Sequence, residues 1–354
     1  MALNVEWLVN VAYGTWKNRQ FHASCIDEAT MGLKNLEGYR GKTDGHILKS
    51  CDDYAMDVLG HRRYAPWLYL YAAVTGMFKE GWIPDNYYGA VVVPKWQGEY
   101  GKIAYLRPMN TLMFQNEAFP DLLSHMNGSF FDTTYRPVSP ESVRDLLFKD
   151  RDHVVFKLNR SMRGQGVHVF DAQSFSVEQV KKLGNGLFQS FIDQHAVLAQ
   201  FAPASVATIR LTTVVEENGN VSVRACNLRL GSGADTHVQS KSQVLVSIDL
   251  KSGAFGDVGY TSDWRELRVH PTSHVPFAGN IVPAFKACTQ TVTELHKKVL
   301  YVRCIGWDVA VDREDRARVM EWNGYYPGLK FNEATQGPCF ADLGWERLRN
   351  ERAR

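Results

Sequence analysis

The chain has 354 residues, of which 45% are hydrophobic and 22% are charged. This length and composition are typical of a soluble globular protein that can form two or three packed lobes around a substantial core. The net charge of +2 lies too close to neutral to indicate a nucleic-acid partner.

The cysteines and the apolar segments indicate a cytoplasmic protein without a membrane span. The six cysteines are scattered, with no CxxC pair and no histidine cluster at zinc spacing, which favours free thiols in a reducing compartment. The first 20 residues lack a basic segment followed by an apolar core, so they do not resemble a signal peptide. The most apolar run, residues 66–78, is shorter than the roughly 20 residues that a spanning helix needs.

Residues 1–80 are predicted to form a helical N-terminal region. Apolar residues recur there at spacings of three and four, in residues 5–16, 51–59 and 65–78. No pattern in this region carries a chemical signature.

A small α/β lobe is expected over residues 81–150, because short strands and helices alternate there. Residues 90–94 are predicted to form a buried strand that ends at a proline. Helices are predicted over residues 110–119 and 139–148, and the second has a proline at its first helical position.

A lysine-bearing strand and a glycine-containing loop follow. Residues 153–158 read as a strand with Lys157 near its end, and a second strand begins at residue 167. The loop between them contains Ser161, Gly164 and Gly166, and such a loop can fold over a polyphosphate with its backbone N–H groups. Neither GxxxxGK[ST] nor GxGxxG is present, so a structural turn with an exposed lysine is the alternative.

Residues 196–201 read as an extended apolar segment that connects two lobes. Adenine is usually held by the backbone of such a segment, with a nearby polar side chain on the ribose. Gln200 is therefore a candidate for the ribose contact. A core strand without a ligand is the alternative.

A run of strands is predicted over residues 207–215, 221–230 and 244–250, with an Asn-Gly hairpin turn after the first. Arg210 and Arg229 lie on the first two. Arginines fixed on a sheet suit bidentate binding of phosphate or carboxylate, and a surface ion pair is the alternative.

A long polar loop over residues 231–242 follows the second of these strands. Its length and glycine content predict a mobile loop at the mouth of an active site. His237 and Lys241 in this loop either touch a substrate or are solvated.

A hairpin over residues 306–311 and 318–323 carries three oxygen-bearing side chains. Glu321 and Asn323 are two residues apart on one strand, so they leave the same face, and antiparallel pairing would bring Asp308 opposite them. These three residues are called the metal set below. Two carboxylates and an amide oxygen suit Mg²⁺, whereas a merely solvated hairpin face is the alternative.

Taken together, these blocks resemble the ATP-grasp superfamily, and most closely its sugar-transfer-associated branch, over about residues 81–340. The order and spacing of the blocks carry the resemblance, and Gly-Trp-Asp-Val-Ala followed by Glu-Trp-Asn is its most specific part. The resemblance implies an α/β (α+β) ATP-grasp fold with two lobes that clasp ATP, after the helical N-terminal region. Residues 81–200 would form the first lobe with the small subdomain, and residues 201–354 the large subdomain with the metal site.

The resemblance also implies roles for the candidate residues. Lys157 would contact the α- and β-phosphates of ATP, the glycine-containing loop would cover the triphosphate, and the metal set would hold Mg²⁺. Arg210 would neutralise the transferred γ-phosphate, with Arg229 as a second candidate. Where the family often has a further lysine before a helix, this chain has Arg107, so that charge comes either from Arg107 or from elsewhere.

By the resemblance, we expect an ATP- and Mg²⁺-dependent, ADP-forming carboxylate–amine ligase that acts through an acyl phosphate. The genes of the branch that the chain resembles accompany polysaccharide assembly. The resemblance therefore suggests amide formation on a uronic acid or another carboxylate of a cell-surface polysaccharide or its precursor, with an amine or amino acid as the second substrate. Two alternatives remain, namely a kinase on the same scaffold and a non-catalytic nucleotide-binding module of polysaccharide assembly. The presence of the metal set argues against the module.

Overall fold

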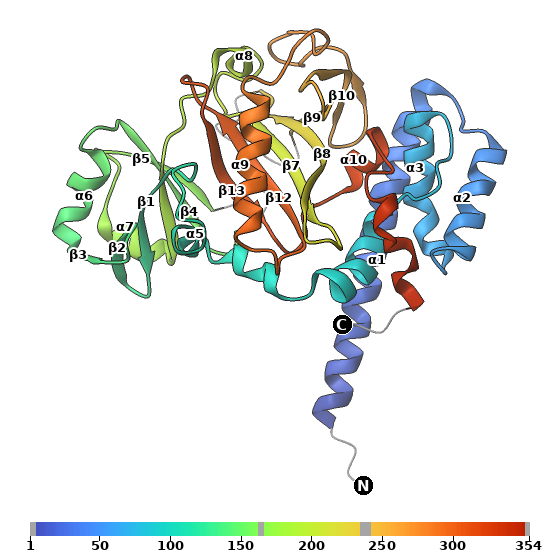
Figure 1. Cartoon of the computed structure of the whole chain (residues 1–354), viewed down its shortest axis with the longest axis horizontal. Helices are drawn as coiled ribbons and strands as arrows, with labels where there is room; N and C mark the ends of the chain where they lie inside the picture. Colours follow the sequence, from blue (N-terminus) through green and yellow to red (C-terminus); the bar gives the residue numbers. More distant parts are fainter. Residues whose placement is uncertain (1–4, 162–165, 234–241, 351–354) are drawn as a thin grey trace. The chain divides into compact units, whose positions relative to one another are not determined.

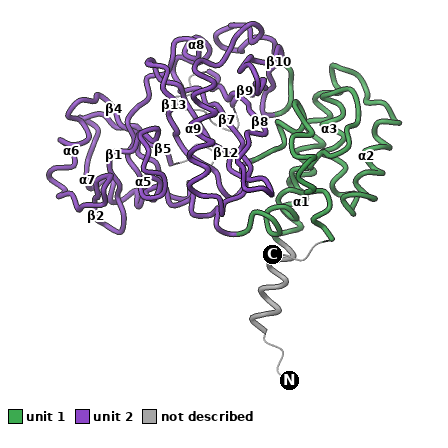
Figure 2. The backbone as a smooth tube through the Cα atoms, in the orientation of Figure 1, with its two compact units in different colours: residues 1–98, 263–266, 328–354 green, residues 99–262, 267–327 purple. Residues whose placement is uncertain are grey.

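The computed structural model describes residues 5–161, 166–233 and 242–350, with the backbone alone for residues 5–16 (Figure 1). The chain divides into two compact units, which are distinguished by colour in Figure 2. The first unit contains residues 1–98, 263–266 and 328–354, and the second contains residues 99–262 and 267–327. The lobes predicted above divide the chain differently and stay a prediction.

The first unit is helical, as predicted for the N-terminal region. Its α-helices are α1 (Val5–Arg40), α2 (Gly45–Asp57), α3 (Ala65–Thr75), α4 (Asp85–Tyr87) and α10 (Lys330–Thr335). Short helices η1 (Arg62–Tyr64), η2 (Tyr88–Gln97), η5 (Ala341–Leu343) and η6 (Trp345–Asn350) complete it. Glu333 on α10 is buried and accepts hydrogen bonds from the backbone N–H groups of Ile83 and Cys339, both at 2.7 Å, so it ties three segments together.

The predicted strand over residues 90–94 is wrong, because these residues belong to η2, a π-helix with Pro94 inside it. A short run of consecutive valines has the same apolar signal in a buried helix as in a buried strand, so periodicity cannot separate the two. None of the described helices is long and apolar enough to cross a membrane.

The second unit contains a six-stranded antiparallel sheet in the order β3-β2-β1-β6-β4-β5. Its strands are β1 (Asp121–Met126), β2 (Ser129–Asp132), β3 (Pro137–Val138), β4 (His153–Leu158), β5 (Val167–Asp171) and β6 (Gly186–Ser190). Helices α6 (Pro140–Phe148) and α7 (Val177–Leu183) contribute to the apolar core on one face, together with Phe156 and Phe188. By alternation, Lys157 on β4 points to the opposite face.

The second unit also contains a seven-stranded sheet in the order β11-β10-β9-β8-β7-β12-β13. Its strands are β7 (Thr208–Val215), β8 (Val221–Leu230), β9 (Val244–Ile248), β10 (Phe255–Thr261), β11 (Glu266–Leu267), β12 (Cys304–Val311) and β13 (Ala317–Asn323). Helix α9 (Phe285–Lys297) buries Val292 and Leu295 in the same core as Ile209 and Trp307 from the sheet. One face of this sheet is thus apolar, and the other is available for polar side chains.

In the described part of the second unit, four further short helices lie outside these sheets, three of them before β1 and one between β6 and β7. They are η3 (Tyr100–Tyr105), η4 (Arg107–Met109), α5 (Asn110–Phe114) and α8 (Ala196–Ala199). The extended conformation predicted for residues 196–201 is therefore wrong, because an apolar run of this length fits a helical turn as well as a strand. The polypeptide crosses from β6 toward the second sheet in residues 191–195, where Gln194 bridges to Asp312 and the His195 N–H donates to the Val311 carbonyl at 2.8 Å.

Candidate functional site

A row of polar side chains crosses four neighbouring strands of the seven-stranded sheet. In the antiparallel register, Asn227 on β8 is opposite Arg210 on β7, Arg210 is opposite Asp308 on β12, and Asp308 is opposite Glu321 on β13. Directly opposite residues share one face of a sheet. The row therefore lies on the face opposite the apolar core, and it joins strands that are far apart in the sequence.

Arg210 and Asp308 form a buried bidentate ion pair at the centre of this row. Their exposed fractions are only 5% and 6%, and Nε and Nη2 of Arg210 donate to the two carboxylate oxygens at 2.6 and 2.7 Å. The remaining Nη1 donates to the carbonyl of Pro327. Burial alone would raise the pKa of Asp308, but the guanidinium groups of Arg210 and Arg229 hold it well below its usual range.

The metal set converges as the hairpin register predicts. Nδ2 of Asn323 lies 3.5 Å from Oδ2 of Asp308 and 3.5 Å from Oε1 of Glu321. The amide nitrogen, which also donates to the Gly306 carbonyl at 3.3 Å, faces the two carboxylates here, and rotating the amide by half a turn would bring the Asn323 oxygen to the same point. No group of three or more His, Cys, Asp or Glu side chains in the described part of the chain could hold a metal. Two carboxylates and one amide, with positions left for water and phosphate, are suited to Mg²⁺.

Lys157 of the six-stranded sheet approaches β13, the strand that carries Glu321 and Asn323. Its Nζ donates to the carbonyl of Met320 on β13 at 3.1 Å. Burial lowers the pKa of Lys157 to about 8, and the nearby Glu321 carboxylate opposes this shift while the Arg107 charge adds to it. β4 and β13 are thus in contact through the Lys157–Met320 hydrogen bond. An incoming anion would stabilise the positive charge of Lys157.

Valine side chains lie beside Lys157 on the face of the six-stranded sheet opposite the α6 and α7 core. In the register, Lys157 is opposite Val167 and Val155 is opposite Val169, and the Val169 side chain is 47% exposed. Open valine side chains beside a lysine suit a flat aromatic base that is attached to phosphates.

Arg107, one of the two alternatives for the charge of the missing family lysine, contacts the metal set. Its Nη2 donates to Oε2 of Glu321 at 2.9 Å and to the carbonyl of Ser161 at 3.2 Å. It therefore links η4, the start of the glycine-containing loop and the metal set.

Four buried polar atoms near these residues lack a hydrogen-bond partner among the described residues. They are Nε of Arg107, Nε of Arg229, Nδ2 of Asn227 and Oγ1 of Thr212. Burial, with the neighbouring Arg210 charge, also lowers the pKa of Arg229 to about 10. Unpartnered buried donors are costly unless a ligand satisfies them. These donors, Lys157 and the metal set therefore fit a polyphosphate with Mg²⁺.

The glycine-containing loop is described only at its ends. Gly166 has φ of +76°, and a Cβ there would lie 2.9 Å from Cβ of Ser161, so a larger residue would strain this closure. The Ser161 hydroxyl donates to the Leu158 carbonyl at 2.8 Å. Gly164, His237 and Lys241 lie outside the described residues.

Gln200 does not join the residues above. It is exposed, follows α8, and donates to Oδ1 of Asn280 at 3.1 Å. Its proposed contact with ribose stays a prediction.

Sequence reasoning missed Asp121, at the start of β1. Gln189 of β6 donates to Oδ1 of Asp121 at 2.7 Å. Burial raises the pKa of Asp121 to about 6, although the Gln189 hydrogen bond and the Lys157 charge oppose the shift. The segment Asp-Leu-Leu-Ser-His-Met does not alternate regularly, so no strand signal marked this residue.

Solved structures with a similar trace are remote in sequence. They include a biotin carboxylase from Campylobacter jejuni, with 9% identity, a TM-score of 0.44, and coverage of 69% of this chain and 46% of that one. The D-alanyl-alanine synthetase A from Vibrio cholerae has 11% identity, a TM-score of 0.41, and coverage of 70% and 65%. An L-amino acid ligase from Bacillus licheniformis has 13% identity, a TM-score of 0.39, and coverage of 70% and 48%. The match thus spans less than two thirds of each of these proteins.

No curated protein matches the sequence. The family model described as sugar-transfer associated ATP-grasp matches residues 129–343, which is more than half of the chain. This match confirms the predicted family and the predicted ATP-grasp fold. Enzymes of the ATP-grasp family use ATP and Mg²⁺. The chain therefore belongs to the sugar-transfer associated ATP-grasp family.

Proposed function

We propose that the protein is an ATP-dependent, ADP-forming carboxylate–amine ligase. The observation that carries this proposal is the convergence of the metal set on β12 and β13 with Lys157, which reaches the same strand from the other sheet. Two carboxylates and an amide beside a lysine are the groups needed to hold a Mg²⁺-bound nucleotide.

The proposed nucleotide contacts use the positively charged side chains that lie near the metal set. Lys157 would bind the α- and β-phosphates, Arg107 would add a second positive charge beside them, and the glycine-containing loop would cover the triphosphate. The metal set would hold Mg²⁺, which supplies charge neutralisation when it is bound. The crossover segment, residues 191–195, together with Val155, Val167 and Val169, would contact the adenine. The predicted ribose contact of Gln200 would compete with its hydrogen bond to Asn280.

The two arginines would have different roles. The hydrogen bonds of Arg210 to Asp308 and Pro327 engage all three of its guanidinium nitrogens, so we assign it to positioning the Asp308 carboxylate. Arg229 keeps an unpartnered Nε and would neutralise the transferred γ-phosphate. By the family resemblance, Arg210 is the first candidate for the γ-phosphate contact and Arg229 the second. We propose the reverse order.

These residues would position the substrates for two successive steps. In the first, a carboxylate oxygen would attack the γ-phosphorus and the bond to the ADP oxygen would break, giving an acyl phosphate and ADP. In the second, the amine nitrogen would attack the acyl carbon, and phosphate would leave as the nitrogen loses a proton. Phosphoryl transfer depends mainly on positioning and charge neutralisation, which Lys157 and Arg229 can provide.

The substrate class rests on the family description alone. Its association with sugar transfer supports a uronic acid or another carboxylate of a cell-surface polysaccharide or its precursor, joined to an amine or amino acid. A cytoplasmic location belongs to the same proposal.

The test has two parts. First, Mg²⁺ with ADP should raise the melting temperature of the wild-type protein, and Glu321→Ala should abolish the increment due to Mg²⁺. Glu314→Ala is the matched control, because this exposed carboxylate lies on the same hairpin outside the metal set. An unchanged Mg²⁺ increment in Glu321→Ala would contradict the metal assignment.

Second, ADP release is measured with ATP, uronic acids and a panel of amines, in the presence and absence of hydroxylamine. The ligase should give an amide, and hydroxylamine should trap a hydroxamate from the acyl phosphate. A stable phosphorylated product would indicate a kinase, and nucleotide binding without turnover would indicate a non-catalytic module.

A further inference from the structure

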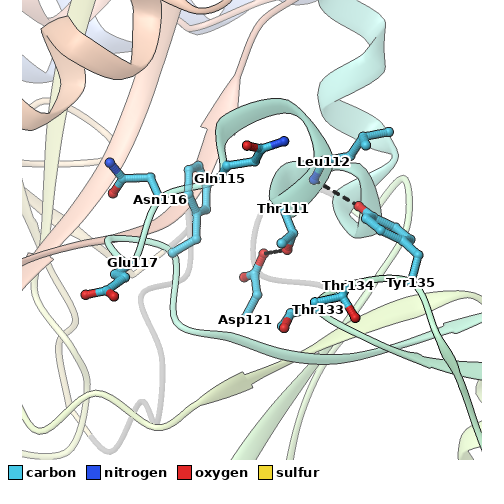
Figure 3. Close-up of a pocket in the computed structure, with 10 residues that line it drawn as sticks. Thr111, Leu112, Gln115, Asn116, Glu117, Asp121, Thr133, Thr134 and Tyr135 are labelled. Atoms are coloured by element: carbon cyan, nitrogen blue, oxygen red, sulfur yellow. Dashed lines mark hydrogen bonds between the residues drawn. The ribbon is translucent and has the colours of Figure 1, made fainter.

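A cavity of about 670 Å³ is lined by residues of α5, β1 and the segments that follow α5 and β2 (Figure 3). This volume is in the range of small-molecule sites. The carboxylates of Glu117 and Asp121, the amides of Gln115 and Asn116, and several hydroxyl groups, including that of Tyr135, line it (Figure 3). The lining thus offers many hydrogen-bond partners beside the apolar side chains of Leu112 and Phe119.

One wall of the cavity is fixed in advance by Tyr135. This residue has φ of +62°, a left-handed conformation that costs a non-glycine residue about 1 kcal/mol. Its hydroxyl donates to the Pro108 carbonyl at 2.6 Å and accepts from the Leu112 N–H at 3.1 Å. The ring is therefore anchored to η4 and α5 without any ligand.

A second wall is shared with the candidate nucleotide site. The two oxygens of Asp121 accept from Gln189 at 2.7 Å and from the Thr111 hydroxyl at 3.4 Å. In the register, Gln189 of β6 stands between Asp121 on β1 and Val155 on β4, two residues before Lys157. A molecule in the cavity would consequently lie next to the residues proposed to bind phosphate and would not replace them.

The charge of the lining selects against anions. Among its ten described lining residues, two carry carboxylates and none carries a cationic side chain. A nucleotide or a carboxylate substrate would be repelled, whereas an ammonium group would gain charge-assisted hydrogen bonds. The hydroxyl and amide groups around the two carboxylates suit a ligand that also bears hydroxyls.

We propose that this cavity binds a protonated primary amine that carries hydroxyl groups, such as an amino sugar. On the ligase function proposed above, on which this step rests, this molecule is the amine substrate. Asp121 would hold the ammonium group, the negative charge of Glu117 at the other side of the lining would attract that group, and Tyr135 and the threonines would surround the hydroxyl groups. The cavity would then deliver the amine beside the nucleotide, where an acyl phosphate would form.

Calorimetric titrations at neutral pH with glucosamine and with its uncharged analogue N-acetylglucosamine test this proposal. The wild-type protein should bind glucosamine about tenfold more tightly, because only this sugar carries the ammonium group. Glu117→Gln, an exposed and nearly isosteric change, should remove most of that preference. Asp145→Asn, an exposed change on α6 outside the cavity, should leave it intact.

Mg²⁺·ADP titrations on the same samples verify folding and separate the two proposals. Glu117→Gln should bind Mg²⁺·ADP with unchanged affinity. Equal affinity for the two sugars, or no glucosamine binding by the wild-type protein, overturns the cavity assignment even when Mg²⁺·ADP binds. Glucosamine binding without Mg²⁺·ADP binding instead refutes the proposed ligase.

Discussion

The two sheets of the second unit carry their charges in different ways on the faces that form the candidate site. On the seven-stranded sheet, Arg210 and Asp308 lie opposite each other in one row and neutralise each other, and the next residue of the row, Glu321, pairs with Arg107. On the six-stranded sheet, Lys157 stands among valines and donates to a carbonyl, with a pKa lowered to about 8. The first face is therefore assembled before any ligand binds, whereas the second gains its main stabilisation from an anion.

Removing the charge at the centre of the row should have the largest effect. Asp308→Asn leaves the buried Arg210 guanidinium without its counter-charge, which should lower the free energy of unfolding by about 3–5 kcal/mol. Urea denaturation measures this loss, and ATP turnover should become undetectable because the metal set is incomplete. Adding Arg210→Met to this variant should restore much of the stability without restoring turnover. If Asp308→Asn lowered the free energy of unfolding by less than about 1 kcal/mol, the Arg210–Asp308 ion pair would not be what stabilises these buried charges.

Replacing Arg210 and replacing Arg229, both on the seven-stranded sheet, should affect stability and turnover differently. Arg210→Met should destabilise the protein by about 3 kcal/mol, because the Asp308 carboxylate stays buried and unpaired. Arg229→Met should change the stability by less than about 1 kcal/mol, since its Nε has no partner to lose, yet lower turnover about 100-fold. Chemical denaturation and steady-state kinetics distinguish the two. Equal losses of stability would contradict the assignment of Arg210 to positioning.

The lowered pKa of Lys157 predicts that stability depends on pH above pH 8, whereas the Arg210–Asp308 ion pair keeps its charges there. Because the pKa of Lys157 is about 8 in the folded protein and 10.5 ordinarily, the unfolded chain binds more protons between these pH values. Wild-type stability should therefore rise with pH in this window relative to Lys157→Met. Conversely, Mg²⁺·ADP affinity should fall as the pH rises through about 8, because the lysine loses its charge. Titrations of both proteins across this range test both statements, and parallel pH profiles would refute them.

The smallest effects are expected from two adjacent threonines on β7. Thr213 accepts from Nε1 of Trp307 at 2.8 Å and donates to Nδ1 of His296 at 2.6 Å, so Thr213→Val should cost about 1–3 kcal/mol. Oγ1 of Thr212 has no partner among the described residues, so Thr212→Val should change stability by less than about 0.5 kcal/mol. Thermal denaturation of both variants provides the comparison. A large loss of stability in Thr212→Val would mean that Oγ1 of Thr212 has a hydrogen-bond partner within the protein.

Local patterns were sufficient for much of the second unit. The strand at residues 153–158 and the hairpin of the metal set were predicted correctly, because each depends on alternation within a few residues of a turn. The errors at residues 90–94 and 196–201 concern short apolar runs, which have no distinguishing period. The first strand of the six-stranded sheet was missed for a related reason, since irregular alternation hides it.

The sequence by itself determined that Glu321 and Asn323 share a face and that Asp308 can stand opposite them, because hairpin register is a local property. It also carried the family resemblance. Only the tertiary structure decided that Arg210 pairs with Asp308, 98 residues away, and that Lys157 reaches Met320 across 163 residues. Those contacts depend on which distant strands become neighbours, and burial at that meeting point sets which charges are neutralised and which remain for a ligand.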